Sequence, residues 1–332
     1  MSELTGLGPL ELGVLESMGG LGATPDHRHV KCDRIVRAIE EETGFGRSYA
    51  YMVMCDLAQP WQARVRLVDF HGNAGGGHYP PAAPVYTEAR LTSTGLLALR
   101  SERAEIGPVP IGLINGTVYQ DGERPPFDPG RVVDALSRLL TDPDLGDEEV
   151  NSLVGPPSFP QPCEVDGDIA ALFQGTKVIL TLRPRYEVAE RDGRPVILIH
   201  DLPPAVWADD VVNILQVHTS DEAWAEWHIG YTPPGRDRLP ISRVRDLTTG
   251  LIDHTGDVVE ISLDLETDPL AVIAALRSPE RHRSHDDEPL LGLRQEVSVD
   301  LGSSVAGLLR AWVGRARGDA SGVQELRRIL GV

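Results

Sequence analysis

Apolar and polar positions in the first sixty residues follow a helical period. Apolar side chains recur at helical spacing through residues 33–43, DRIVRAIEEET, and Gly44 follows as a helix stop. Residues 47–59 predict a second helix, which ends before Pro60. The pattern therefore predicts a helix, a tight turn and a second helix, which is the layout of a helix-turn-helix core.

The pattern changes after the second predicted helix. Residues 67–84 are rich in Gly and Pro and predict a system of loops, whereas residues 86–102 resume a helical pattern. Residues 106–116, IGPVPIGLING, predict a buried strand.

Strands and helices alternate in the rest of the chain. Residues 127–142 predict a helix with one apolar face, and residues 176–203 predict a strand, a turn and a strand. The pattern predicts further helices over 203–217 and 268–277 and a strand over 258–265. Interleaved strands and helices indicate a mixed α+β fold class for this region.

Composition and charge limit the classes of protein and partner. The 332 residues are 41% hydrophobic and 24% charged, which is ordinary globular composition. The formal net charge is −19, and taken as a whole it argues against a polyanionic partner. However, residues 1–110 hold 10 Lys and Arg against 13 Asp and Glu, so the acidity belongs to the later two thirds. The first third can still meet DNA if its basic side chains converge.

Cysteine usage and the N-terminal sequence indicate a reducing compartment. Cys32, Cys55 and Cys163 are far apart and form neither a zinc motif nor an even set for disulfides. No stretch approaches 18 apolar residues, and acidic residues interrupt the first twenty positions. We therefore expect a cytoplasmic protein with no membrane segment, no metal site and no cofactor of its own.

Several motifs together resemble one enzyme family. Tyr86-Thr87-Glu88-Ala89-Arg90-Leu91, preceded by Leu67-Val68-Asp69 and Gly72-Asn73, resembles the breakage-reunion region of type IIA DNA topoisomerase A subunits, the gyrase and topoisomerase IV class. The similarity covers roughly residues 8 to 278. It includes these further segments: 24–26, 31–36, 46–48, 132–136, 193–199 and 241–246.

The resemblance implies a fold and a set of partners. It implies a winged-helix domain over residues 1–106 and a tower-like αβ domain over residues 107–332, without the family's coiled-coil gate and C-terminal pinwheel. It also implies DNA as a partner, a homodimer, and a separate gyrase B-like subunit with toprim and ATPase domains. Mg²⁺ would enter only through that toprim subunit.

The resemblance also implies roles for individual residues. Tyr86 matches the family's nucleophile, whose phenol attacks a DNA phosphate with the help of nearby cations. The family's cationic or histidine positions, however, hold the following residues here: Leu12, Gly13, Phe45 and Val85. Because these side chains cannot stabilise negative charge, the sequence predicts a degenerate active site in which Tyr86 is retained mainly for packing or hydrogen bonding.

The expected DNA contacts are less altered. Four basic residues and one serine lie on or beside the two predicted helices, namely Lys31, Arg34, Arg37, Arg47 and Ser48. The alternative is a solvated helix face, since Glu40, Glu41 and Glu42 share the segment. Ser48 matches a serine that contacts quinolone drugs in the family, but Met52 replaces the acidic partner, so weak quinolone binding is expected.

Three hypotheses follow. The first is an A-subunit-like protein that binds DNA, has impaired tyrosine-mediated cleavage and modulates gyrase. The second is an active A-type subunit that uses Tyr86 together with a separate toprim and ATPase subunit. The third is an acidic interaction or decoy module that does not bind DNA. The sequence alone leaves all three open.

Overall fold

The computed structural model describes eleven stretches of the chain: 2, 4–60, 62–75, 80–116, 124–204, 206, 211, 241–246, 258–263, 267–277 and 294–332. The chain forms two compact units, each described by itself. Unit 1 consists of Met1–Pro160, Gly167–Leu180 and Val297–Val332. Unit 2 consists of Gln161–Asp166 and Thr181–Glu296.

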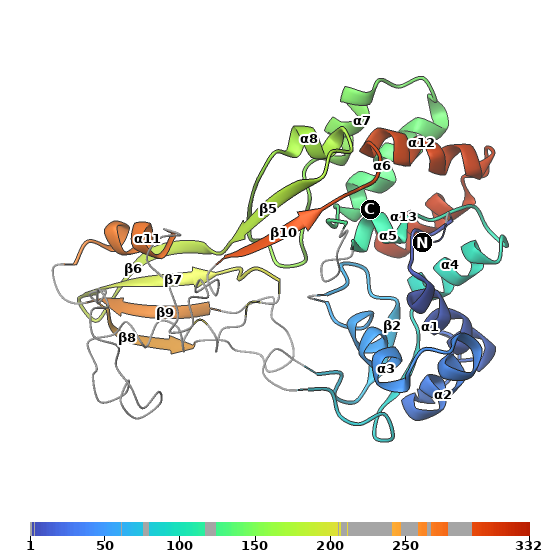
Figure 1. Cartoon of the computed structure of the whole chain (residues 1–332), viewed down its shortest axis with the longest axis horizontal. Coiled ribbons are helices and arrows are strands. Elements are labelled where there is room, and N and C mark those ends of the chain that lie inside the picture. The colour runs from blue at the N-terminus through green and yellow to red at the C-terminus, as the bar shows by residue number, and fades with distance from the viewer. Residues whose placement is uncertain are drawn as a thin grey trace. The chain divides into compact units, whose positions relative to one another are not determined.

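Unit 1 is mainly helical and holds one small sheet (Figure 1). Its helices are α1 (Pro9–Gly20), α2 (Cys32–Thr43), α3 (Arg47–Asp56), α4 (Ser93–Glu102), α5 (Ile111–Asn115), α6 (Pro129–Thr141), α7 (Asp147–Val154), α8 (Ile169–Phe173), α12 (Val305–Ala316) and α13 (Ser321–Leu330). The strands of its small sheet are β1 (Val30–Lys31), β2 (Val68–His71) and β3 (Glu88–Leu91).

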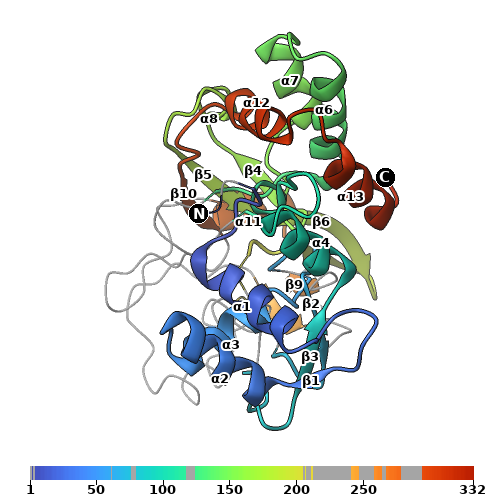
Figure 2. The same cartoon turned by 90° about the vertical axis from the view of Figure 1, so that its right-hand side faces the viewer.

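Helices α2 and α3 confirm the predicted order of helix, turn and helix. One face of α2 is buried, and the chain leaves the helix at Gly44 with a φ of 75°, a conformation that favours glycine. Gly46 precedes α3, so only three residues separate the two helices. Helix α1 packs against both of them (Figure 2). These three helices form the base from which the candidate site is presented.

The small sheet corrects two predictions. Residues 86–102 are not helical throughout: β3 occupies Glu88–Leu91, and α4 begins only after Thr92, whose side chain accepts a hydrogen bond from the Gly95 amide. Ala89 and Leu91 are buried while their neighbours are not, which is the alternation of a strand. The predicted loop system over 67–84 likewise contains β2, which pairs antiparallel with β3 in the order β1-β3-β2.

The strand predicted over residues 106–116 is also wrong. The segment forms the short helix α5, because Pro108 and Pro110 carry no amide hydrogen and interrupt the ladder of a strand. Its buried amides find other acceptors: Val109 donates to the Leu4 carbonyl at 3.1 Å, and Gly112 donates to the Thr5 carbonyl at 2.7 Å. The apolar composition therefore indicated burial correctly but not the backbone conformation.

Helix α6 confirms the prediction over residues 127–142. The Asp128 carboxylate accepts a hydrogen bond from the Arg131 amide at 3.0 Å and caps the helix, whose apolar side is buried. The last two helices, α12 and α13, pack against α6, and α13 also packs against α4. The end of the chain thus contributes to the core of unit 1.

Unit 2 contains an antiparallel sheet of four strands in the order β6-β7-β9-β8. The remaining elements of the chain are β4 (Glu164–Asp166), β5 (Val178–Arg183), β6 (Arg185–Arg191), β7 (Arg194–His200), β8 (Ile241–Asp246), β9 (Val258–Leu263), α11 (Pro269–Arg277) and β10 (Gln295–Val299). Of β5 and β10, only the residues from Thr181 onward and up to Glu296 belong to unit 2. Strand β4 pairs antiparallel with the second half of β5. β6 and β7 form the predicted hairpin, which turns at Asp192 and Gly193 with φ values of 52° and 74°.

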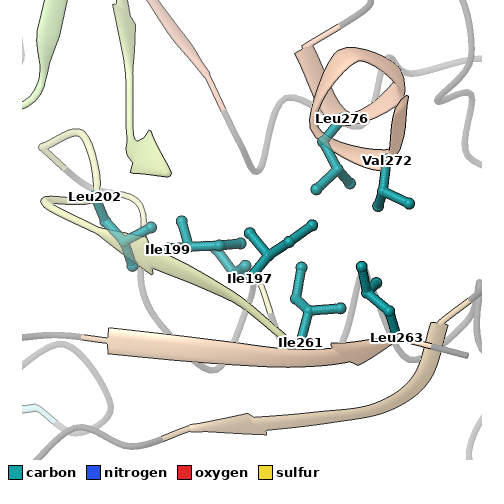
Figure 3. Close-up of a cluster of buried hydrophobic side chains, with 8 residues drawn as sticks. Ile197, Ile199, Leu202, Ile261, Leu263, Val272 and Leu276 are labelled. Atoms are coloured by element: carbon teal, nitrogen blue, oxygen red, sulfur yellow. The ribbon is translucent and has the colours of Figure 1, made fainter. Parts of the chain in front are cut away.

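The core of unit 2 lies between this sheet and α11. Figure 3 shows Ile197 and Ile199 of β7 together with Ile261 and Leu263 of β9, and α11 contributes Val272 and Leu276 to the same cluster. The predicted helix over 268–277 and strand over 258–265 are confirmed. The helix predicted over 203–217 falls almost entirely outside the described residues.

Taken together, the described elements confirm a mixed α+β fold class with small antiparallel sheets. None of the helices seen in the described stretches combines the length and apolar character that crossing a bilayer requires.

Candidate nucleic-acid interface

Tyr86 lies on an exposed turn at the edge of unit 1. Its side chain is 77% exposed, and the side chain before it, Val85, is 55% exposed. The Tyr86 amide donates to the Ala83 carbonyl at 2.9 Å and closes the turn. Among the described residues, the phenol of Tyr86 has no hydrogen-bond partner, so its oxygen faces solvent.

Two amides at the start of α2 fix the backbone of this turn. The Cys32 amide donates to the Thr87 carbonyl at 3.0 Å, and the Asp33 amide donates to the Pro84 carbonyl at 3.1 Å. These are amides of the first helical turn, which have no acceptor within the helix. The Tyr86 turn is therefore docked on the N-terminus of α2.

A row of basic side chains runs along the exposed side of α2. Lys31 precedes the helix, and Arg34 and Arg37 follow at intervals of three residues, all exposed. Within the part of the chain that the structure describes, the Arg34 guanidinium has no ion-pair partner. These three side chains therefore share the exposed side of α2, and their contact with DNA stays a prediction.

The other basic residues of the candidate site are paired with carboxylates. Lys31 Nζ lies 3.0 Å from Glu88 Oε1, and the hydrogen bond from Lys31 holds the pKa of Glu88 below its usual value. An Arg37 guanidinium nitrogen lies 2.7 Å from an Asp33 oxygen, one helical turn away. Lys31 and Arg37 therefore form ion pairs within the protein, which agrees with the alternative of a solvated helix face.

Helix α3 presents a second exposed face beside α2. Arg47 occupies its first position and lies 2.6 Å from Glu40 of α2, measured from Nε to Oε2. Ser48 follows and is exposed, and its side chain makes no capping bond because Gly46 is the cap residue. Met52 lies one turn farther along and is 51% exposed. Ser48 and Met52 thus share one accessible face.

The four positions where the resemblance calls for a cation or a histidine differ in their surroundings. Val85 is open to solvent, whereas Leu12 is half-buried in α1. A Cβ on Gly13 would lie only 2.7 Å from Thr43 Cγ2, so α1 and α2 approach each other closely at this glycine. The Phe45 ring packs edge-on against Tyr49 with centroids 6.3 Å apart. Three of the four positions are thus tied to packing.

The sequence interpretation missed a ladder of charged side chains on the outer face of the sheet. Strand register places Lys31 opposite Glu88 and places Glu88 opposite His71. In the next row, Arg90 Nε lies 2.8 Å from Asp69 Oδ2. The alternation Glu88-Ala89-Arg90-Leu91 was the available signal, and the helical pattern that follows it concealed the strand.

A second unpredicted feature is a pair of carboxyl groups between α1 and α3. Burial raises the pKa of Asp56 from 3.8 to about 6, and the charge of Glu11 adds to the effect. Burial also raises the pKa of Glu11, whose Oε2 accepts a hydrogen bond from the Gly8 amide at 2.6 Å. Glu11 directly precedes the two α1 positions where the resemblance calls for arginines.

Comparison with known proteins agrees with these motifs. No protein-family model matches the chain. The chain is 30% identical over 224 residues to the DNA gyrase A subunit of Halalkalibacterium halodurans, a match that covers 60% of this chain and 27% of that protein. It is 27% identical over 309 residues to the DNA topoisomerase 4 A subunit of Synechocystis sp., covering 82% of this chain and 31% of that protein. The chain is a divergent homologue of the type IIA topoisomerase A subunits.

A third similar protein is the DNA gyrase A subunit of Streptococcus pneumoniae, at 30% identity over 240 residues, 64% of this chain and 28% of that protein. The chain therefore spans between 27% and 31% of the length of these curated relatives. This homology supports an A-subunit-like function. It leaves the roles of Tyr86 and the basic row as proposals.

Proposed function

We propose that this protein is an A-subunit-like DNA-binding protein whose tyrosine-mediated strand cleavage is impaired and which modulates gyrase. In this proposal residues 1–106 form a winged-helix domain that contacts DNA, and residues 107–332 form a tower-like domain. The protein acts in the cytoplasm as a homodimer and meets a gyrase B-like subunit that carries the toprim and ATPase domains. The names of the similar proteins, the A subunits of gyrase and of topoisomerase 4, support this class of partner.

The basic row on α2 is the observation that carries the DNA-binding proposal. Lys31, Arg34 and Arg37 share one exposed face, and Arg47 with Ser48 opens the neighbouring helix. Exposed ion pairs stabilise a fold by about 0–1 kcal/mol, so a DNA phosphate can replace Asp33 as the partner of Arg37 at little cost. Charge-assisted contacts to phosphate then fix the position of the backbone without reading the bases.

Weak cleavage is expected because uncharged residues occupy the positions where the resemblance calls for cations. Attack by the phenol oxygen forms a bond to phosphorus and breaks the bond to the sugar oxygen of the DNA strand, while the phenol loses its proton to water and the departing sugar oxygen takes one up from water. Cations must stabilise the charge that builds up on the phosphoryl oxygens, and a single lost donor of this kind lowers the rate by about 10²–10³. Val85 and Leu12 supply no such charge. Mg²⁺ from a toprim partner would assist the leaving oxygen.

One observation favours the second hypothesis, in which the protein is catalytically active. Tyr86 is not buried as a packing residue would be, since its ring is 77% exposed on a turn that two amides of α2 hold in place. An exposed phenol on a fixed backbone is the arrangement that a nucleophile requires. The impaired-cleavage and active-enzyme hypotheses both agree with an accessible Tyr86. They differ in whether the chain supplies enough positive charge for cleavage.

Salt-dependent DNA binding tests the first part of the proposal. We expect affinity for duplex DNA to fall steeply with salt, and Arg34→Ala to weaken binding and to lower the salt slope by about 1. Arg328→Ala is the matched control, because Arg328 is exposed in the same unit but lies on α13. Equal effects of the two substitutions would contradict the basic row, and absence of binding at low salt would favour the decoy hypothesis.

A cleavage assay separates the first two hypotheses. The protein is incubated with supercoiled DNA, divalent metal and the cognate toprim subunit, and covalent protein–DNA adducts are counted. We expect few adducts from the natural sequence, and none from Tyr86→Phe. Abundant adducts that disappear in Tyr86→Phe would instead establish the active enzyme of the second hypothesis. Strong quinolone-induced stabilisation of the complex would refute the weak drug binding expected from Met52.

A further inference from the structure

A buried hydrogen-bond network lies beneath the Tyr86 turn and reaches it from α3. Tyr51 is buried on α3, and its hydroxyl lies 2.5 Å from the Ala82 carbonyl oxygen and 2.9 Å from Thr87 Oγ1. Ala82 and Thr87 lie on either side of the segment that carries Tyr86. One side chain of α3 thus contacts both ends of that segment.

The direction of each hydrogen bond follows from the groups involved. A carbonyl oxygen only accepts, so the single Tyr51 hydroxyl proton must point at Ala82. In the 2.9 Å contact the Thr87 hydroxyl is then the donor to the Tyr51 oxygen, which is a closer acceptor than the Pro84 carbonyl at 3.4 Å. Burial raises the pKa of Tyr51, which keeps its phenol protonated and able to donate. The chain of donors therefore runs from Thr87 through Tyr51 to Ala82.

Thr87 ties this network to the other support of the turn. Its side chain is fully buried, and its carbonyl accepts the Cys32 amide of α2. A buried threonine directly after an exposed tyrosine thus connects α2, α3 and the turn. Removing one partner would leave a polar group without its bond in a site that water reaches poorly.

We propose that Tyr51 is a positioning residue for Tyr86, acting through the Thr87 hydroxyl and the Ala82 carbonyl. The inference rests on the proposed role of Tyr86 at the DNA backbone. Tyr51 itself is buried and does not reach DNA; it fixes the backbone conformation of the turn from which the Tyr86 side chain extends. Without the Tyr51 hydroxyl, the turn keeps its hydrogen bonds to the Cys32 and Asp33 amides of α2 but loses the hydrogen bonds that Tyr51 of α3 makes to it.

Amide exchange and fluorine NMR on the DNA-free protein test this inference. In Tyr51→Phe we expect the Tyr86 and Cys32 amides to exchange at least tenfold faster, while amides of α6 keep their rates. With 3-fluorotyrosine incorporated, the Tyr86 resonance, assigned by its loss in Tyr86→Phe, should move toward the position of free tyrosine. Tyr49→Phe is the matched control, because Tyr49 lies two residues away on α3 and is partly exposed.

Substitutions at Thr87 test whether its hydroxyl is required. Thr87→Ser keeps the hydroxyl and should leave the Tyr86 resonance unchanged, whereas Thr87→Val should reproduce the effect of Tyr51→Phe. A Tyr51→Phe protein in which all amides exchange faster to the same extent would show a merely structural role and overturn the proposal. An unchanged Tyr86 resonance would overturn it as well. Because both readouts omit DNA, failure of DNA binding or of cleavage is recorded separately.

Discussion

The carboxyl pair between α1 and α3 predicts an unusual pH dependence of stability. Asp56 has a pKa near 3.8 in an unfolded chain and about 6 in the folded protein, mainly because of burial. Between these values the folded state binds more protons than the unfolded state, so the free energy of unfolding falls as pH rises. The stabilisation by neutral Asp56 is complete below about pH 4 and lost above about pH 6.

The size of the effect follows from the displacement of the pKa. About two pH units at 1.4 kcal/mol each correspond to about 3 kcal/mol of stability that the charged Asp56 costs the fold at neutral pH. Asn at this position cannot ionise and has almost the same shape. We therefore expect Asp56→Asn to leave stability unchanged near pH 4 and to raise it by about 1–3 kcal/mol at pH 7.

Denaturant unfolding from pH 4 to pH 8 measures this difference. The natural protein and Asp56→Asn are compared at each pH, so that the titration of groups that do not interact with Asp56 cancels. Asp26→Asn, at an exposed position in a turn, is the matched control for replacing a carboxyl group by an amide. If the Asp56→Asn difference were constant across the range, the buried charge would not be the cause and the reasoning would fail.

Four further substitutions test other parts of the structure. Val85→Arg should leave the melting temperature unchanged, because the site is exposed, but should strengthen DNA binding and increase the salt slope by about 1, as measured by a salt titration. Gly13→Arg should cost about 1–3 kcal/mol of stability in denaturant unfolding because its Cβ would meet Thr43, whereas Leu12→Arg, at a half-buried position, should cost less. Ile261→Ala should cost about 2–5 kcal/mol of unfolding free energy, and a loss below 1 kcal/mol would contradict its place in the core of unit 2.

The spacing of apolar residues was sufficient to predict a helix or strand wherever one period continued without interruption. The helix over 33–43 was predictable because its buried stripe ends at Gly44, and the helix over 127–142 because its buried stripe follows the Asp128 cap. The hairpin at Asp192 and Gly193 was predictable because its turn chemistry is specific. The strand β3 was not, since four residues of alternation stand directly before a helical run, and its partners β1 and β2 are distant in sequence.

The candidate site shows the same division between local and tertiary information. Tyr86 and the basic residues of α2 could be found from the sequence, because they lie in motifs that match those of the family in residue type and spacing. The partners of the basic residues were not predictable: Glu88 meets Lys31 across a sheet, and Glu40 meets Arg47 across a turn between helices. Tyr51 was passed over because its importance lies in a contact with Thr87, which the fold alone creates.

The positions that depart from the family's charge pattern are not equivalent, and this bears on the choice between the first two hypotheses. Val85 is exposed and could accept an arginine in one substitution. Gly13, in contrast, allows α1 and α2 to approach each other closely, so a larger side chain there requires the helices to separate. Phe45 is engaged with Tyr49 on α3. An arginine could replace an exposed residue such as Val85 without disturbing the fold. At Gly13 the same substitution would disturb the packing of α1 against α2. Helix packing therefore opposes an arginine at Gly13, one of the positions where the resemblance calls for a cation, although the exposed turn of Tyr86 is retained. This supports impaired cleavage over full activity.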